Sequence, residues 1–144
     1  MTRYVLGFLI DNGYVVLIRK KRPSWQFGKL NGVGGHIELG EDEYEAMERE
    51  FLEETGFSTH DIPWKKFCVM SNEKEGWEVS CFWATGVLTR CQTKTDEEVE
   101  IHEISEFMRP YSSRIGIENL GWLLSMIESQ KQDQVEFYKV EYIR

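Results

Sequence analysis

The stretch Gly35–Phe57, GHIELGEDEYEAMEREFLEETGF, decides the fold, because it contains a helix whose two ends are both marked in the sequence. Glu41 or Asp42 can cap the start of this helix, and Gly56 stands where a left-handed C-terminal cap would fall. The residues between the caps are good helix formers, with no Pro, Gly or β-branched residue before Thr55. We therefore predict a helix that ends at Gly56.

Three carboxylates share one face of this predicted helix. At about 100° per residue Glu50, Glu53 and Glu54 lie together, beside a side formed by apolar residues. The apolar residues are Tyr44, Met47 and Phe51. At roughly 5 Å and an effective dielectric constant of about 20, each carboxylate pair costs about 3 kcal/mol. Arg49 projects to another side of the helix and cannot neutralise all three charges, so another positive group is expected.

Carboxylate oxygens that converge on one point, without Cys or His among them, are typical ligands of a hard cation such as Mg²⁺ or Mn²⁺. Mg²⁺ keeps several waters and readily bridges carboxylates to a phosphate. A bound divalent ion can neutralise charge that develops at phosphorus and lower the pKa of a bound water. The alternative is a solvated acidic helix face, which most charge runs form.

The spacing of the stretch favours the metal site. From Gly35 to Phe57 the chain reads G-x5-E-x7-R-E-F-L-E-E-T-G-F, which resembles the signature of the Nudix hydrolases at every fixed position. The resemblance implies an α+β fold, an α/β/α sandwich with a mixed β-sheet between helices. It also implies Mg-dependent hydrolysis of a pyrophosphate bond in a nucleoside diphosphate linked to another moiety, with Mn²⁺ as a possible substitute.

The resemblance assigns roles to residues of the signature. It implies that three side chains and one main-chain carbonyl hold the metal: Glu50, Glu53, Glu54 and Gly34. Glu50 is also the candidate general base. Arg49 and Glu41 resemble the pair that braces the loop against the helix. The alternative for that pair is a surface ion pair, which would contribute little.

The family often uses one further acid outside the signature. Four residues compete for this place: Asp96, Glu97, Glu98 and Glu100. We expect Glu98 to be the additional metal ligand, but one sequence does not fix the register. The three histidines receive no role, because none forms a ligand pair by spacing. They are His36, His60 and His102.

The segment before the signature carries the signal for the substrate. Lys29–Gly35, KLNGVGG, resembles the corresponding segment of Nudix enzymes that remove oxidised purine nucleotides, in which an Asn at the position of Asn31 contacts the base. An amide can both donate to and accept from a purine edge; the alternative is that Asn31 only shapes the turn. Leu30 replaces a frequent Trp and Val33 a frequent Pro, and the first departure weakens the analogy.

The leading substrate is therefore an ordinary or oxidised (d)NTP, cleaved to a nucleoside monophosphate and pyrophosphate. The alternatives are an NDP-sugar or other nucleotide-derivative pyrophosphohydrolase, and a non-catalytic Nudix-like nucleotide-binding module. Such a module usually loses the signature carboxylates, which this chain keeps.

Further residues are candidates for contact with the substrate. Trp25 lies in the loop Pro23–Leu30 and either packs in the core or as a lid, or stacks on a base. Arg19 or Lys20 either reaches the substrate phosphates or forms a solvated strand end. Gly35, like the small residues before it, lets the main chain approach a phosphate closely.

The remaining pattern completes the α+β architecture. We predict strands over Arg3–Ile10, Tyr14–Ile18, Trp64–Met70, Trp77–Leu88, Val99–Ile104 and Val135–Ile143, a connection over Pro110–Arg114, and a second helix over Glu118–Gln130. The Asn12-Gly13 turn makes the first two strands a hairpin. With 144 residues, we expect residues 1–144 to form a single domain.

Composition limits the partners. The net charge of −8 disfavours duplex nucleic acid and anionic membranes, since both need a basic surface. Three cysteines without metal-ligand spacing indicate reduced thiols in a cytoplasmic protein. The N-terminus resembles neither a signal peptide nor a transmembrane segment. We expect a monomer or homodimer that acts on a small-molecule nucleotide.

Overall fold

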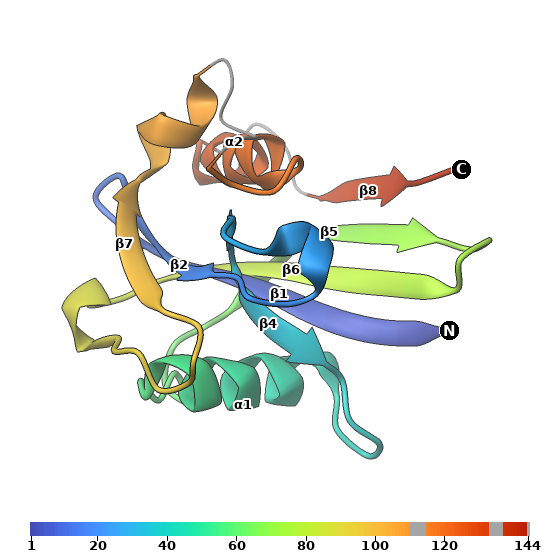
Figure 1. Cartoon of the computed structure of the whole chain (residues 1–144), viewed down its shortest axis with the longest axis horizontal. Coiled ribbons are helices and arrows are strands. Elements are labelled where there is room, and N and C mark those ends of the chain that lie inside the picture. Colours follow the sequence, from blue (N-terminus) through green and yellow to red (C-terminus); the bar gives the residue numbers. More distant parts are fainter. Residues whose placement is uncertain (110–114, 133–136, 144) are drawn as a thin grey trace.

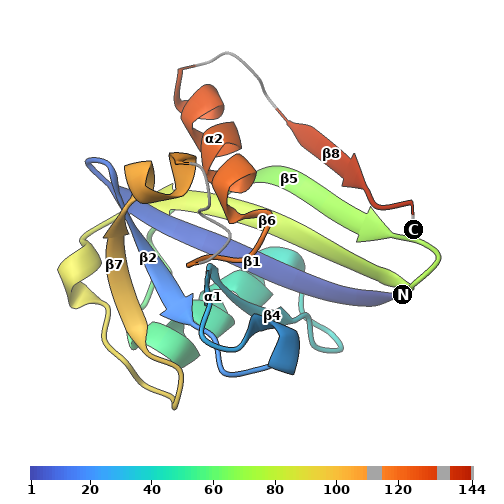
Figure 2. The same ribbon diagram turned by 45° about the horizontal axis from the view of Figure 1, so that its top comes forward.

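The computed structural model describes residues 1–109, 115–132 and 137–143. Within these ranges an eight-stranded mixed sheet follows the order β3-β2-β1-β6-β5-β8, with β4 paired to β1 and β7 paired to β2 (Figure 1). The strands are β1 (Thr2–Asp11), β2 (Tyr14–Arg19), β3 (Leu30–Asn31), β4 (Val33–His36), β5 (Lys65–Asn72), β6 (Trp77–Thr85), β7 (Val99–Glu103) and β8 (Tyr138–Glu141). Figure 2 shows β7 and β8 at opposite edges of the sheet.

Two α-helices cover the two faces of the sheet, as the α/β/α sandwich predicts. Helix α1 (Glu43–Thr55) packs on one face and α2 (Leu120–Lys131) on the other (Figure 1). Each helix closes its own apolar core, with Met47 and Phe51 in one and Leu124 and Ile127 in the other. Three short 3₁₀ segments complete the described structure: η1 (Ser24–Gln26), η2 (Leu88–Arg90) and η3 (Ile104–Met108). No helix in the described ranges is long and apolar enough to cross a bilayer.

Strand β1 organises the sheet around the place where α1 meets it. Along its whole length β1 pairs in parallel with β6. Its other edge is shared, because β4 pairs with Tyr4–Gly7 and β2 with Ile10–Asp11, both antiparallel. This arrangement places the glycines of β4 directly beside α1.

Both ends of α1 form as the sequence predicts. The Asp42 carboxylate accepts a hydrogen bond of 2.8 Å from the Glu45 amide, and the Glu45 carboxylate accepts one of 3.0 Å from the Asp42 amide. This reciprocal capping box identifies Asp42 rather than Glu41 as the cap. Gly56 closes the helix in the left-handed conformation, with φ of 72°.

The other predicted elements are present with shifted ends, and one segment differs. No strand was predicted over residues 30–36, yet they form β3 and β4, with Gly32 between the two strands. Glycine weakens a strand by itself, but here the pairing with β1 and the lack of space for side chains outweigh this preference. The predicted final strand Val135–Ile143 is present as β8 and ends earlier, at Glu141, and its first two residues lie outside the described residues. The predicted connection Pro110–Arg114 lies outside the described residues.

Candidate active site

Two carboxylates of α1 lie against the glycines of β4. Glu54 Oε2 accepts a hydrogen bond of 3.1 Å from the Gly34 amide. The Glu50 carboxylate occupies the space above Gly35, where a Cβ would lie 2.4 Å from its Oε1. A side chain at Gly34 would meet the Val5 carbonyl oxygen at 2.0 Å. The two glycines therefore let α1 bring its carboxylates onto the backbone of β4.

The Gly34 carbonyl shares this location. In a strand the N–H and C=O of one residue point to the same edge, and Gly34 directs its N–H to Glu54 rather than to β1. Its carbonyl oxygen therefore also points away from β1. An oxygen acceptor from the main chain thus accompanies the carboxylates of α1.

Arg49 links the other carboxylates. Its Nη1 lies 2.9 Å from Glu50 Oε1 and 3.3 Å from Glu53 Oε2. The expectation that Arg49 projects away from these acids is wrong for Glu50 and Glu53, because the long side chain bends back along the helix. The Glu53 side chain is 55% exposed, against 14% for Glu50. Glu53 therefore lies at the rim, and Glu50 and Glu54 lie inside.

Arg49 also braces the loop between β4 and α1. Its Nε and Nη2 donate to the two oxygens of Glu41 at 3.0 and 2.6 Å, and Nη2 donates to the His36 carbonyl at 2.9 Å. Glu41 in turn accepts from the Glu38 amide at 2.8 Å. The hydrogen bonds from Arg49 are the main cause that lowers the pKa of Glu41. These hydrogen bonds fix the loop between β4 and α1 against the helix.

The inner carboxylates carry unbalanced charge. Burial raises the pKa of Glu54 to about 8; Lys20 opposes this shift, whereas the charges of Glu50 and Glu97 add to it. Burial also raises the pKa of Glu50, although the hydrogen bond from Arg49 opposes the change. A buried carboxylate of this kind is stabilised either by binding a proton or by a cation close to it. The site is therefore electrostatically prepared for a positive ion.

The described part of the chain contains no complete metal cluster. Within residues 1–109, 115–132 and 137–143, no three acidic, imidazole or thiol side chains are arranged as a finished site. The donors that do meet, Glu50, Glu54 and the Gly34 carbonyl, are all hard oxygen atoms, which suit Mg²⁺ or Mn²⁺. The oxygen donors of these residues therefore suit a divalent ion. Glu53 would have to turn inward and leave Arg49 to join them.

The structure places Glu97, not the expected Glu98, beside the helix carboxylates. Glu97 is only 5% exposed, and its charge acts on Glu54. It accepts hydrogen bonds from Lys20 Nζ at 3.2 Å and from the Lys21 amide at 2.6 Å. The Glu98 side chain is exposed, because the chain turns before it enters β7. Glu97 is therefore the buried acid of this segment whose charge acts on Glu54.

The other two candidate acids are engaged elsewhere. Asp96 pairs with Arg22 at 2.6 Å on the surface. Glu100 forms a two-pronged ion pair with Arg19. Arg19 also donates to the Gly28 carbonyl at 2.9 Å, so its guanidinium is held away from α1. Besides Arg49, the structure brings Lys20 to the acidic site, where it bonds to Glu97 and its charge acts on Glu54.

Asn31 and Trp25 differ in availability. Asn31 Oδ1 accepts from the Gly32 amide at 2.8 Å, and its Nδ2 donates to Gln26 at 3.3 Å. These bonds connect the Asn31 side chain, at the end of β3, to Gly32 and to η1. Trp25 lies on η1 and is 70% exposed, so it is not a core residue. Its ring faces are accessible for stacking.

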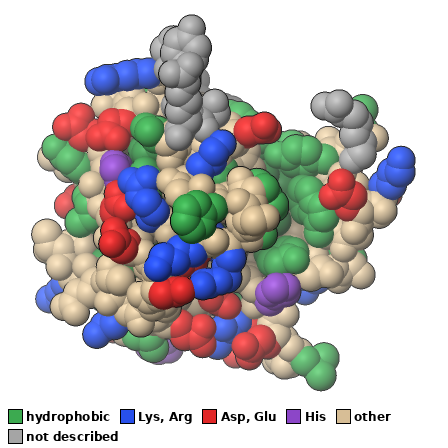
Figure 3. All heavy atoms as spheres, viewed as in Figure 1, with side chains coloured by type: hydrophobic (Ala, Val, Ile, Leu, Met, Phe, Trp, Pro, Cys, Tyr) green, Lys and Arg blue, Asp and Glu red, His purple; other side chains and the backbone are tan. Residues whose placement is uncertain are grey.

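An apolar row on the α2 face begins two residues from Gly34. The strand register places His36, Tyr4, Val79 and Met70 side by side on β4, β1, β6 and β5. The rings of Tyr4 and His36 lie 4.5 Å apart. Figure 3 shows hydrophobic side chains gathered toward the ends of these strands, next to interleaved basic and acidic side chains. Tyr4 and Val79 are half-buried and Met70 is buried, and the row lies on the sheet face opposite to α1.

Asn119 reaches over this row and was not found from the sequence. It stands at the N-cap of α2, yet among the described residues its side chain caps no backbone amide. Instead its Nδ2 lies 3.4 Å from Met70 Sδ. Within the described residues its buried Oδ1 has no hydrogen-bond partner. In a sequence, an Asn before a helix indicates an N-cap, so the contact of Asn119 with Met70 was not predicted.

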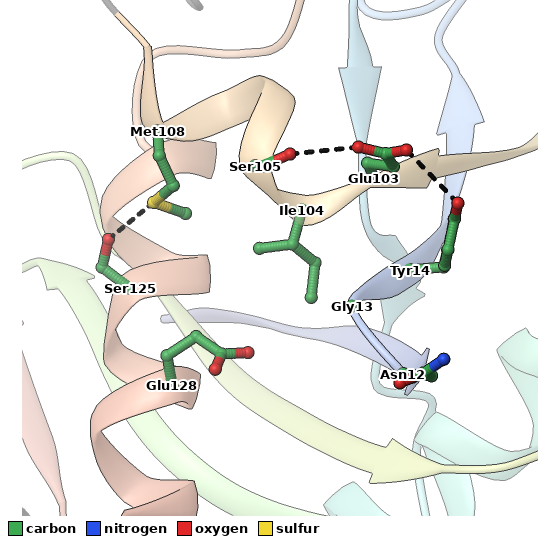
Figure 4. A pocket seen from close by; sticks show the side chains of 9 residues that line it. All are labelled: Asn12, Gly13, Tyr14, Glu103, Ile104, Ser105, Met108, Ser125 and Glu128. Atoms are coloured by element: carbon green, nitrogen blue, oxygen red, sulfur yellow. Dashed lines mark hydrogen bonds between the residues drawn. The ribbon is translucent and has the colours of Figure 1, made fainter.

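A separate hollow of about 600 Å³ lies at the far side of the fold, between the β1–β2 turn, η3 and α2 (Figure 4). Glu103 in this hollow already accepts hydrogen bonds from Tyr14 and Ser105, both at 3.2 Å. Ser125 donates to Met108 Sδ at 3.1 Å. No residue of α1 or β4 lines the hollow. Its size alone does not make it the active site.

Comparisons with known proteins agree with this geometry. Residues 1–114 match the family model of the NUDIX domain. A NUDIX hydrolase from Nitrosomonas europaea superposes with a TM-score of 0.74 at 18% identity, over 99% of this chain and 79% of that chain. A MutT protein from Bacillus halodurans gives 0.68 at 21% identity, over 99% and 91%. A MutT NUDIX hydrolase from Burkholderia pseudomallei gives 0.70 at 17% identity, over 88% and 97%.

Proposed function

This chain belongs to the NUDIX domain family and is a pyrophosphohydrolase of nucleoside diphosphate derivatives, and we propose that its substrate is an ordinary or oxidised (d)NTP. The proposed products are a nucleoside monophosphate and pyrophosphate, and the proposed ion is Mg²⁺, with Mn²⁺ as a substitute. One observation carries the proposal: Glu50 and Glu54 lie half-buried on Gly34 and Gly35 with raised pKa values.

We assign the metal to the inner carboxylates. Glu50, Glu54 and the Gly34 carbonyl hold it in this proposal, and Glu53 joins from the rim. The ion, when bound, supplies charge neutralisation at the pyrophosphate and a lower pKa for water. Arg49 keeps the helix and loop in place through Glu41, so the ligands need no further ordering when the substrate arrives.

Two of these residues also handle protons and phosphate in the proposed reaction. Glu50 takes the proton of the attacking water, because burial brings its pKa toward the working pH of a base. Lys20 contacts a phosphate oxygen, since it is the cation nearest to Glu54 and Glu97. Glu97 holds Lys20 in position through the bond of 3.2 Å.

The nucleobase, in this proposal, lies on the apolar row of Tyr4, Val79 and Met70. The unsatisfied Oδ1 of Asn119 can accept from a ring N–H or an exocyclic amine. This assignment moves base recognition from Asn31 to Asn119, because the amide of Asn31 is already hydrogen-bonded to Gly32 and Gln26. Trp25 covers the entrance as an aromatic lid.

The same proposal covers the chain as a whole. Residues 1–144 act as one domain, because the segment beyond residue 114 adds strand β8 to the sheet and helix α2 to one of its faces. The net charge of −8 favours a small nucleotide over duplex nucleic acid or a membrane surface. A cytoplasmic monomer or homodimer remains our prediction.

Incubation with a panel of nucleotides, oxidised nucleotides and NDP-sugars in Mg²⁺, followed by product analysis, tests the proposal. We expect turnover of a (d)NTP to the monophosphate and pyrophosphate. Preferred cleavage of an NDP-sugar would replace the substrate assignment. Nucleotide binding without cleavage of any panel member, under conditions where Mg²⁺ also binds, would point to a non-catalytic module and overturn the proposed reaction.

A further inference from the structure

Glu43, in the first turn of α1, contacts three strands of the sheet. Its carboxylate accepts hydrogen bonds from Lys66 Nζ on β5 at 2.8 and 3.1 Å, and from Ser80 Oγ on β6 at 2.7 Å. Arg3 Nη2 on β1 lies 3.8 Å away. The side chain is only 17% exposed. The start of α1 is therefore fixed to the sheet by a specific polar contact.

Glu43 lies on the same stripe of α1 as the inner carboxylates. At about 100° per residue, Glu43, Glu50 and Glu54 fall within an arc of roughly 40°. Met47 belongs to this stripe and packs over Gly7, where a Cβ would lie 2.5 Å from its Cε. The stripe therefore meets the sheet at four successive points, and a turn or slide of the helix at one point displaces the others.

The two ends of the stripe are neutralised differently. At Glu43, burial would raise the pKa, but hydrogen bonds from Lys66 and Ser80 outweigh it and lower the pKa. At Glu54, burial dominates and the pKa rises to about 8. The chain thus supplies its own cation to Glu43. At the other end, Arg49 bonds to Glu50, whereas Glu54 accepts a hydrogen bond from the Gly34 amide and the charge of Lys20 does not offset its burial.

We propose that Glu43, held by Lys66 and Ser80, is a positioning residue for the metal site: it sets the rotation and height of α1 so that Glu50 and Glu54 meet the glycines of β4. The proposal rests on the proposed metal-dependent function. Glu43 touches neither metal nor substrate, since it precedes Glu50 by two helical turns, about 10 Å. A displacement of about 1 Å at a catalytic group is enough to change a rate by up to ~100-fold.

The test measures Mn²⁺ binding to the protein alone by electron paramagnetic resonance, without substrate. Glu43→Gln keeps the shape of the side chain and removes its charge, and Lys66→Met removes the partner. Trp83→Phe is the matched control, because it removes a hydrogen bond of 2.7 Å to Gln130 on the α2 face. Melting temperatures of all three variants are recorded, so that each titration is made well below unfolding.

We expect the Kd for Mn²⁺ to rise about tenfold in Glu43→Gln and in Lys66→Met, as for other residues that orient metal ligands. In Trp83→Phe we expect a lower melting temperature with an unchanged Kd. The exchanged pair Glu43→Lys with Lys66→Glu should recover part of the lost affinity. Because Ser80 and Arg3 also contact Glu43, recovery will be incomplete.

Unchanged Mn²⁺ affinity in both Glu43→Gln and Lys66→Met would overturn the positioning role and leave the proposed function in place. The same holds if Trp83→Phe weakens Mn²⁺ binding equally, since general destabilisation would then explain the effect. A wild-type protein that binds no Mn²⁺ and cleaves no nucleotide would instead overturn the proposed function, and the positioning role with it.

Discussion

The Gly34 amide nitrogen lies 3.1 Å from Oε2 of Glu54, and this contact joins the sheet to the acidic stripe of α1. It places a carboxylate with a raised pKa on the backbone of β4, next to a carbonyl that points the same way. A buried carboxylate beside a second one is stable only with a proton or a cation. The proposed chemistry follows from that requirement.

Glu54 should make the stability of the metal-free protein depend on pH. Its pKa is about 8 in the folded chain and about 4.3 in an unfolded one. Between these values the folded state binds more protons, so the free energy of unfolding falls as pH rises. Glu54→Gln should reduce this slope, and Glu50, whose pKa is also raised, accounts for what remains. Chemical denaturation with EDTA from pH 5 to 9 measures it, and equal slopes in both proteins would refute the assignment.

Metal affinity should also depend on the protonation of Glu54, but unlike stability it should increase with pH. An ion bound by Glu54 has to displace its proton, so affinity should increase with pH until about pH 8 and then level off. Calorimetric titration with Mg²⁺ in buffers of different ionisation enthalpy should show proton release below that pH. Affinity that stays constant from pH 6 to 8 would mean that Glu54 does not bind the ion.

Alanine at the two glycines of β4 should have different consequences. Gly35→Ala places a Cβ 2.4 Å from the Glu50 carboxylate, a side chain that can move, so the protein should fold but lose most activity. Gly34→Ala meets the Val5 carbonyl at 2.0 Å, which is backbone and cannot yield. It should cost several kcal/mol of stability, as overpacking does. Thermal melts and initial rates separate the two, and a fully active Gly35→Ala would contradict the placement of Glu50.

Glu97→Gln and Glu98→Gln form a matched pair on adjacent residues. Glu97 is buried and holds Lys20, so its change should lower kcat/KM by about tenfold or more, as for other groups that orient a site. Glu98 is exposed and should be close to wild type. Steady-state kinetics on the best nucleotide decide between them. A larger loss in Glu98→Gln would restore Glu98 as the additional acid.

Asn119→Ala should alter the choice of base, whereas Asn31→Ala should mainly disturb its turn. The buried Asn119 Oδ1 has no hydrogen-bond partner within the described residues, and a lost hydrogen bond to the base would change discrimination by about 1 kcal/mol or more. The ratio of kcat/KM for purine and pyrimidine nucleotides measures it. If that ratio changes only in Asn31→Ala, the base is recognised at the turn instead.

Much of the fold could be predicted because local signals and tertiary structure agree. The cap at Asp42, the glycine at Gly56 and the Asn12-Gly13 turn specify their elements with little help from the rest of the chain. Strand β4 could not be predicted in this way. Its glycines have low strand preference, and only the neighbouring β1 and the helix above them show why they must be glycine.

The signature residues were predicted by spacing, and their contacts were not. Helical periodicity places the Cβ atom of Arg49, but its long side chain reaches Glu50 and Glu53 by bending. Similarly, a shift of one residue decides whether Glu97 or Glu98 points inward. The sequence before β7 does not alternate between apolar and polar residues, so it does not show which of the two is buried. Asn119 was missed because its role depends on Met70, which is distant in sequence.

Anomalous scattering from crystals grown with Mn²⁺ tests the central claim most directly. We predict a peak within coordination distance, about 2 Å, of carboxylate oxygens of Glu50 and Glu54 and close to the Gly34 carbonyl. In that state Arg49 should have released Glu53 and kept Glu41. A Mn²⁺ site elsewhere, or none at saturating Mn²⁺ with Arg49 still on Glu50 and Glu53, would contradict the account.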